Sequence, residues 1–223
     1  MSRQEILSRI RKSLNASEQD TQRQETAAAR IAKPPCATPP DRVAAKSVSL
    51  IECFKTELER QLATVKTVST LDEVPASIAD YLRGENQALS LRVGTEPIFS
   101  NLDFSAAGLS TQSGPAEAHD GAGLSGAFGA AAETGTMALL SGPENPVTLG
   151  FLPDTHIIVI PQSRIKATYE VVFALLRNEK GAGTMPRTLN LISGPSRTAD
   201  IGGRIVIGAH GPRRLLAIIV SGR

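Results

Sequence analysis

The sequence predicts an α/β fold: a layered, mostly parallel sheet flanked by helices, with an N-terminal helical extension. Two observations support this prediction. Apolar residues recur at helical spacing in some segments, and short runs of β-branched residues stand between those segments. Such alternation is typical of parallel sheets, because parallel strands need long crossover connections. A chain of 223 residues with 41% hydrophobic residues is long enough for one main domain of this kind.

The first part of the chain predicts a helix followed by a linker. Ser2 and Glu5 have the spacing of a capping box, and four prolines within residues 34–40 favour extended chain. Apolar residues at four-residue intervals, as in an amphipathic helix, are Ile6, Ile10 and Leu14. We therefore expect an N-terminal amphipathic helix and a Pro-rich linker over residues 1–42, and the α/β domain over residues 43–223.

The remaining segments alternate between helix and strand patterns. Helical spacing is found in the segments from Ile51 to Leu62, Val74 to Leu82 and Tyr169 to Arg177. The expected strands are Thr64–Val68, Ala88–Val93, His156–Pro161, Thr188–Ile192, Arg204–Ile207 and Leu215–Val220. The unbroken β-branched run after His156 predicts a strand that is buried on both faces.

The composition argues against several classes of protein. The chain has no tryptophan and 4% aromatic residues, and residues 47–223 hold 15 basic and 17 acidic side chains, which disfavours nucleic-acid binding. No apolar run reaches the roughly 20 residues of a membrane helix or resembles a signal peptide, so we expect a cytoplasmic protein. Cys36 and Cys53 lack metal-ligand spacing, and no glycine-rich nucleotide motif follows a strand. We expect no metal and no other cofactor in this chain.

The segment Ser193–Asp200 follows an expected strand and carries groups that bind anions. The candidate anion-binding residues are Ser193, Gly194, Ser196, Arg197, Thr198 and Asp200. Their hydroxyl groups, guanidinium and backbone amides suit a phosphate or a carboxylate. Ligands of open α/β sheets bind at the carboxyl ends of strands, and we expect the segment there. The same sequence also suits a tight turn in which Asp200 accepts backbone N–H groups and Arg197 forms a surface ion pair.

A second loop places a histidine on a constrained turn. His210 is followed by Gly211 and Pro212, directly after the expected strand Arg204–Ile207. Histidine is the side chain whose unperturbed pKa lies nearest neutrality, so His210 is a candidate proton donor or acceptor beside an anionic ligand. We assign Gly211 to the same anion site. The alternative is that the ring nitrogens of His210 only join two loops.

A third motif, Ala132–Thr136, precedes another apolar stretch. A carboxylate among small apolar residues is costly unless it is paired, so Glu133 is a candidate catalytic residue. The candidate ligand-binding residues beside it are Thr134, Gly135 and Thr136. The alternative is structural, with Glu133 pairing with an arginine such as Arg197 or Arg204.

Four sequence motifs, in this order, are similar to one known family. They read GLSGAFGAAAETGTMAL, LPDTHIIVIP, SGPSRTADI and GAHGP, and they fall within about residues 124–220. In this the chain resembles the LUD domain family, and within it the small C subunits of bacterial lactate-utilisation systems. The resemblance implies a fold like that of ribose-phosphate isomerases and CoA transferases. It also implies a part in oxidising L-lactate to pyruvate, beside partner subunits that carry iron–sulphur clusters.

Two functions remain open at this point. The first is an accessory subunit that binds a small carboxylate or phosphate and docks on the iron–sulphur subunits. Its N-terminal helix would then contact its own domain, a partner or a second copy in a homo-oligomer. The second is a stand-alone enzyme of the acyl-CoA transferase or sugar-phosphate isomerase type that uses Glu133 and His210. Glu133-Thr134-Gly135 is similar to the Glu-Asn-Gly of CoA transferases, with threonine in place of asparagine. Glu133 could equally accept the hydroxyl proton of a 2-hydroxy acid whose carboxylate binds Arg197.

Overall fold

The computed structural model describes residues 2–17, 20–34, 36–44, 49–201 and 203–222, and it leaves the side chains of Asp200 and Ile201 undescribed. The chain forms two compact units, Met1–Thr38 and Pro39–Arg223. The first unit contains helices α1 (Arg3–Ser13) and α2 (Thr21–Ala32). In α1 the predicted capping box is confirmed, since Ser2 and Glu5 bond each other's backbone N–H groups. Its apolar residues Ile6, Ile10 and Leu14 are exposed.

The second unit is built on a six-stranded sheet in which all neighbouring strands are parallel, so the predicted α/β class is confirmed. Its strand order is β1 (Thr64–Val68), β12 (Arg214–Val220), β7 (Thr155–Pro161), β4 (Ala122–Gly126), β2 (Ser90–Val93) and β3 (Ser110–Ser113). Strand β7 lies in the middle and is buried along six of its seven residues, as its β-branched sequence predicts. The likeness to ribose-phosphate isomerases and CoA transferases stays a prediction.

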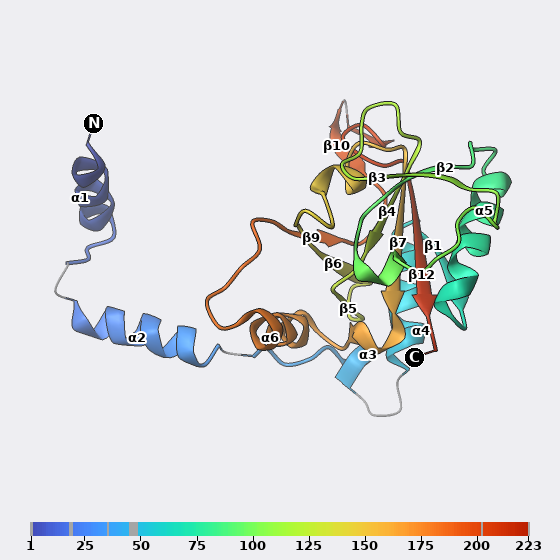
Figure 1. Ribbon diagram of the computed structural model, residues 1–223. Helices are drawn as coiled ribbons and strands as arrows, with labels where there is room; N and C mark the ends of the chain where they lie inside the picture. The colour runs from blue at the N-terminus through green and yellow to red at the C-terminus, as the bar shows by residue number, and fades with distance from the viewer. Residues whose placement is uncertain (1, 18–19, 35, 45–48, 202, 223) are drawn as a thin grey trace. The chain divides into compact units, whose positions relative to one another are not determined.

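Two smaller sheets accompany the central one. A four-stranded mixed sheet has the order β8 (Ile165–Lys166), β5 (Gly129–Ala131), β6 (Thr136–Leu140) and β9 (Leu189–Ile192). An antiparallel hairpin consists of β10 (Arg197–Ile201) and β11 (Arg204–Ile207). Figure 1 shows β10 near the end of the central sheet from which β12 starts, and the C-terminus near the opposite end.

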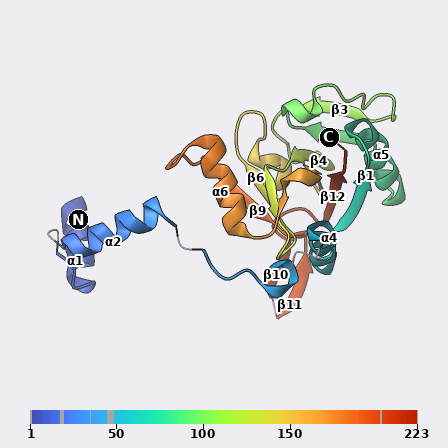
Figure 2. The same cartoon turned by 90° about the horizontal axis from the view of Figure 1, so that it is seen from below.

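Helices cover both faces of the central sheet (Figures 1 and 2). Helix α5 (Val74–Gly84) packs on one face through Ile78 and Leu82. Helix α4 (Leu50–Arg60) and the four-stranded sheet pack on the other, where Phe54 and Leu58 meet Met137. Helix α6 (Tyr169–Lys180) lies against β5, on the far side of the four-stranded sheet. The remaining short helices are α3 (Asp41–Ala44), η1 (Leu71–Glu73), η2 (Pro97–Phe99), η3 (Val147–Gly150) and η4 (Gln162–Arg164).

The structure corrects two expectations about the Ser193–Asp200 segment. Residues Arg197–Ile201 are not part of a loop but form strand β10, because they pair with the β-branched strand β11. Strand β9, which precedes the segment, runs antiparallel to β6 in the four-stranded sheet. The segment therefore does not follow a strand of the parallel sheet. Its backbone instead joins the loop that leads into β12, at the amino end of that sheet.

The Glu133 motif lies at the entry to a strand, as the sequence predicts: Glu133–Gly135 form the turn that follows β5 and leads into β6. Gly135 has a φ of 63°, and a Cβ atom there would lie 2.4 Å from the Leu58 backbone nitrogen of α4. A glycine is needed at this position because the turn adopts a left-handed conformation in close contact with a helix.

Candidate functional site

A cavity of about 510 Å³ lies at the amino end of the central sheet, between the start of β12 and the segment after β9. The sequence-predicted residues that line it are Ser193, Gly194, Ser196, Arg197, His210 and Gly211. Two loops that were picked out separately in the sequence thus meet around one cavity. Four other predicted residues, Glu133, Thr134, Gly135 and Thr136, do not line it, and neither does Thr198 on β10. The Asp200 side chain lies outside the described residues.

Backbone hydrogen bonds hold the two loops together at Ser196. The Ser196 N–H donates to the Pro212 carbonyl at 2.8 Å, and its carbonyl accepts from the Gly208 N–H at 2.8 Å. On the other side, a Cβ atom at Gly194 would lie 2.6 Å from the Gln61 carbonyl oxygen at the end of α4. Gly194 thus lets the loop contact the helix end. The cavity wall is therefore fixed by the backbone.

Arg197 supplies the permanent positive charge of this cavity. Its Nη2 donates to the side-chain oxygen of Gln61, which places the guanidinium at the rim. His210 lines the same cavity and is exposed. Among the described lining residues none carries a carboxylate. A site with a guanidinium, an imidazole and two serine hydroxyls, and without a carboxylate, suits a small anion.

His156 on β7 reaches the same cavity from inside the sheet and was missed by the sequence analysis. The residue is 1% exposed, and its Nε2 lies 3.1 Å from the Ser125 hydroxyl oxygen. Burial lowers the pKa of His156 to about 3, so the ring is neutral near pH 7. A Cβ atom at Gly150 would lie 2.9 Å from the ring. A histidine, next to Thr155 at the start of an otherwise apolar strand, was the available sequence signal.

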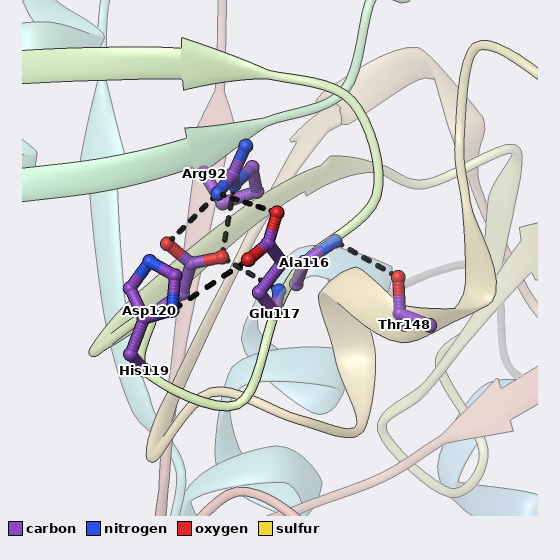
Figure 3. Close-up of polar contacts among 6 residues, drawn as sticks. All are labelled: Arg92, Ala116, Glu117, His119, Asp120 and Thr148. Carbon is purple, nitrogen blue, oxygen red and sulfur yellow. Dashed lines mark hydrogen bonds and ion pairs between the residues drawn. The ribbon is translucent and has the colours of Figure 1, made fainter.

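A buried ion pair between Arg92 and Asp120, drawn in Figure 3, supports the η3 side of the cavity. Gly150 and Phe151 line the cavity on that side. Arg92 on β2 is 8% exposed, and its Nε and Nη2 donate to the two carboxylate oxygens of Asp120 at 2.9 and 3.3 Å. Burial by itself raises the pKa of Asp120, but the Glu117 N–H and Arg92 outweigh that effect and hold the pKa below its usual range. The carboxylate therefore stays charged at neutral pH.

The loop that contains Asp120 is tied directly to η3. The Ala116 N–H donates to the Thr148 hydroxyl oxygen at 2.9 Å, as Figure 3 shows. Asp120 also accepts from the Glu117 N–H at 2.7 Å, which closes a turn between these two residues. The ion pair thus positions a loop, and that loop positions the short helix beside the cavity.

Glu133 makes contacts that are mainly structural. Its Oε1 accepts the Tyr169 N–H at 2.8 Å, at the start of α6, where Thr168 gives no side-chain cap. A carboxylate there satisfies a free N–H and interacts favourably with the helix dipole. Its backbone carbonyl accepts from Arg42 Nε at 2.6 Å. Pairing of this carboxylate with Arg197 or Arg204 is not among the contacts of the described residues.

Thr134 and Thr136 form a hydroxyl cluster with Tyr169 behind the cavity. Their Oγ1 atoms lie 2.8 Å apart and contact the Tyr169 hydroxyl at 2.9 and 2.7 Å. Thr136 also donates to the Ser193 hydroxyl at 3.3 Å. Since Ser193 lines the cavity, this cluster orients one cavity hydroxyl from inside the fold. Within the described residues no group of three His, Cys, Asp or Glu could hold a metal ion, and no helix could cross a membrane.

Comparison with known proteins identifies the domain that contains this cavity. Residues 116–220 match the LUD domain. Lactate utilization protein C of Geobacillus thermodenitrificans is 39% identical over 94 residues, which are 41% of this chain and 39% of that protein. Uncharacterized protein NMB1437 of Neisseria meningitidis is 41% identical over 100 residues, covering 44% and 42% of the two chains. This chain thus spans about two fifths of the length of these relatives.

The fold is also found in a solved structure. A crystal structure of a DUF162 family protein from Deinococcus radiodurans has a TM-score of 0.56 and 27% sequence identity, and it covers 77% of this chain and 96% of that one. The matched LUD region begins before β4 and extends to the end of β12, so it includes both loops of the cavity. The match to the LUD domain covers residues 116–220, and within this region the resemblance drawn from the sequence motifs is confirmed.

Proposed function

We propose that this chain takes part in lactate utilisation as an accessory subunit that binds a small carboxylate in the cavity at the amino end of the sheet. The similarity to proteins named Lactate utilization protein C supports the general role. The main observation in support of the anion site is that Arg197 and His210 line one cavity. Both residues lie within the region that matches the LUD domain.

The chemistry of the cavity suits a 2-hydroxy or 2-oxo acid. A guanidinium such as that of Arg197 binds a carboxylate through two parallel hydrogen bonds. Ser193, Ser196 and His210 offer donors and acceptors for a hydroxyl or carbonyl oxygen on the next carbon. The apolar lining residues Phe151, Leu189, Leu191, Ile192 and Leu215 suit a short alkyl group. Lactate and pyruvate combine these three features.

The electrons of lactate oxidation are carried elsewhere in this proposal. The chain has two cysteines, and an iron–sulphur cluster is ordinarily held by four cysteine thiolates. We therefore assign the clusters to partner subunits, with this chain in the cytoplasm. The exposed apolar residues Ile6 and Ile10 of α1 are the contact proposed for those partners.

Titration calorimetry with L-lactate and with pyruvate tests the anion site. The wild-type chain binds at least one of them, and Arg197→Ala weakens that binding by more than about 1.5 kcal/mol, the low end for a hydrogen bond to a charged group. Arg204→Ala removes an exposed arginine from the same hairpin, outside the cavity, and leaves the affinity unchanged. Equal affinities of wild type and Arg197→Ala for both acids would reject the anion site.

Co-purification tests the accessory role. The full chain carrying Ile6→Asp and Ile10→Asp folds as the wild type does, because both positions are exposed, but it loses its iron–sulphur partners. Turnover of lactate, an acyl-CoA or a sugar phosphate by the purified chain alone, abolished by Glu133→Gln, would instead favour the stand-alone enzyme. That alternative lacks geometric support, because Glu133 does not line the cavity that holds His210.

A further inference from the structure

A second cavity, of about 600 Å³, lies at the opposite end of the central sheet. It is reached by Gly126 at the end of β4, Pro161 at the end of β7 and Glu96 in the segment after β2. This is the carboxyl edge of a parallel sheet, where ligands of open α/β folds bind. A larger groove beside it shares Pro97, Ile98 and Pro161 with it, so the cavity opens onto an extended depression.

The Glu96 carboxylate is held by hydrogen bonds in a set of contacts, here called the cradle, that requires glycines beside it. Its carboxylate oxygens accept the Gly126 N–H at 3.2 and 3.0 Å, and Oε1 also accepts from Asn145 Nδ2 at 3.0 Å. Cβ atoms at Gly94 and Gly126 would lie 2.7 and 2.8 Å from the carboxylate. Asn145 is itself buried and donates to the Gly126 carbonyl as well. Two glycines and a buried amide thus fix one carboxylate against the cavity.

The surroundings of Glu96 favour its neutral form. Burial is the main cause that raises the pKa of Glu96 to about 7; the Glu144 carboxylate acts in the same direction, and the Gly126 N–H and the Asn145 amide act in the opposite one. The other charged residues lining the cavity are Glu144, Arg164 and Lys180. Arg164 forms an ion pair with Glu179, and its guanidinium lies 5.6 Å from the centre of the Phe128 ring. The cavity therefore combines two carboxyl groups, those of Glu96 and Glu144, with two cationic side chains.

We propose that this cavity is a second ligand site, which binds a small organic anion carrying a hydroxyl or carbonyl group. The Glu96 carboxyl group, in its protonated form, donates a hydrogen bond to that oxygen, and Arg164 and Lys180 attract the anionic group. Each carboxyl oxygen of Glu96 has hydrogen-bonding capacity beyond its cradle contacts, which a cavity ligand can use. The site is separate from the Arg197 cavity, since the two share no lining residue.

Carbon-13 NMR of the full chain labelled at glutamate carboxyl carbons tests this proposal, with the Glu96 signal assigned by its loss in Glu96→Gln. The probes are L-lactate, pyruvate and ribose 5-phosphate, each at millimolar concentration. The expected result is that at least one probe raises the apparent pKa of Glu96, because it binds the protonated form. Response to the first two only indicates a carboxylate ligand, and response to the third only indicates a phosphate. A Glu96 signal that none of the three probes moves would overturn the proposal.

Calorimetry in two buffers with different ionisation enthalpies gives an independent readout. When the pH equals the pKa of Glu96, binding of the responding probe takes up about half a proton per site. In Glu96→Gln the amide oxygen can still accept from the Gly126 N–H and from Asn145 Nδ2, the second acceptor is replaced by an amide nitrogen, and this proton uptake is lost. Arg164→Gln and Lys180→Gln together raise the Kd at least about tenfold.

Arg197→Ala separates the two cavities. The proposal requires that the Glu96 response to the probe is retained in Arg197→Ala, whatever happens at the other cavity. If Arg197→Ala abolishes the Glu96 response, the ligand occupies the amino-end cavity alone and the second site is rejected. A third outcome is that no probe binds in the amino-end cavity and the Glu96 signal still responds. The anion site of the proposed function is then rejected, and the second site is retained.

Discussion

The two cavities at opposite ends of the central sheet each contain an ionisable side chain whose charged form burial disfavours, but the two pKa values move in opposite directions. At the amino end, desolvation lowers the pKa of His156 to about 3. At the carboxyl end, desolvation raises the pKa of Glu96 to about 7. A base and an acid respond with opposite signs to the same cause, because burial always disfavours the charged form.

The difference between these two pKa values shows which cavity contains a group that exchanges a proton near neutral pH. His156 has a polar contact to Ser125 and is 1% exposed, and burial lowers its pKa to about 3, so it stays neutral well below neutral pH. Glu96 is partly exposed to its cavity and sits near the midpoint of its titration at neutral pH. The amino-end cavity therefore relies on the fixed charge of Arg197, while the carboxyl-end cavity contains a group that can gain or lose a proton.

The largest expected effect concerns the ion pair that supports the η3 side of the amino-end cavity. Arg92→Leu leaves the Asp120 carboxylate, whose side chain is 13% exposed, without its partner. Breaking a buried pair from one side lowers the free energy of unfolding by roughly 3–5 kcal/mol. Urea denaturation measures this loss. The same variant should weaken carboxylate binding in the amino-end cavity, because the loop between Ala116 and Asp120 is tied to η3.

The matched control is Arg83→Leu, which removes an exposed ion pair with Asp80 and one hydrogen bond to the Ala107 carbonyl. Such pairs contribute at most about 1 kcal/mol. If Arg92→Leu and Arg83→Leu lower the free energy of unfolding by similar amounts, the buried ion pair does not stabilise the amino end of the sheet.

The second effect is the acid sensitivity that His156 confers. The unfolded chain binds a proton at this residue below about pH 6.5, whereas the folded chain does so only below about pH 3. The contribution of neutral His156 is therefore complete above pH 6.5, and stability falls by about 1.4 kcal/mol per pH unit below it. Between pH 7 and pH 4 the stability advantage of wild type over His156→Gln should shrink by roughly 3 kcal/mol.

His119→Gln serves as the control, because the His119 side chain is 72% exposed. Its unfolding free energy should follow that of wild type across the same pH range. A difference between wild type and His156→Gln that stays constant from pH 7 to pH 4 would show that the imidazole is protonated in the folded state.

Substitutions of two glycines on strand β4 compare how much stability depends on close packing at the two cavities. In Gly123→Ala, near the amino end of β4, the new Cβ atom would lie 2.3 Å from the backbone oxygen of Leu149 in η3. In Gly126→Ala, at the carboxyl end, it would lie 2.8 Å from the Glu96 carboxylate. A backbone atom cannot easily move, so we expect Gly123→Ala to cost roughly 1–3 kcal/mol and Gly126→Ala less, because a side-chain end can turn away.

Thermal unfolding ranks the two glycine variants, and the NMR signal of Glu96 tells what Gly126→Ala does. Loss of the cradle should return the pKa of Glu96 toward its ordinary value, since the carboxylate is pushed toward solvent. If Gly126→Ala loses more stability than Gly123→Ala, the Glu96 side chain cannot turn away from the new Cβ atom, which contradicts the prediction.

The parallel sheet could be predicted because its signals are local. The β-branched run after His156 and the apolar strand Leu215–Val220 each predict a buried strand, and β7 and β12 lie in the middle of the sheet. Strand β10 could not be predicted in the same way. Its sequence, RTADI, is mostly polar and includes Ala and Asp, which are depleted in strands, and it becomes a strand by pairing with β11, which is a tertiary contact.

The candidate site residues likewise include some that local sequence signals predict and some that depend on tertiary contacts. Ser196, Arg197 and His210 could be picked out because glycine and proline mark the loops that contain them. The anion loop was placed at the wrong end of the sheet because the sequence does not tell which of three sheets a strand joins. Glu96 and His156 were missed as site residues, since burial decides their chemistry and burial depends on distant residues such as Gly126 and Gly150.

The smallest expected effect is the pH dependence that Glu96 adds to stability, and its sign is opposite to that of His156. Glu96 has a folded-state pKa of about 7, above the ordinary value of about 4.5, so the folded chain keeps a proton that the unfolded chain has lost between these two values. Wild type should therefore lose stability relative to Glu96→Gln as the pH rises from about 4.5 to about 7. Partial exposure reduces the change to roughly 1–2 kcal/mol.

Urea denaturation of wild type and Glu96→Gln across this pH range measures the effect, and the curve for His156→Gln gives the contrasting slope. Relative to their variants, the glutamate then destabilises the wild-type fold toward neutral pH, while the histidine destabilises it toward acid. If the Glu96→Gln difference is flat with pH, Glu96 is ionised throughout, and the carboxyl-end cavity holds a fixed negative charge instead of an exchangeable proton. A carboxylate of that kind would repel the organic anion, so one measurement decides both the contrast between the two ends and the chemistry of the second site.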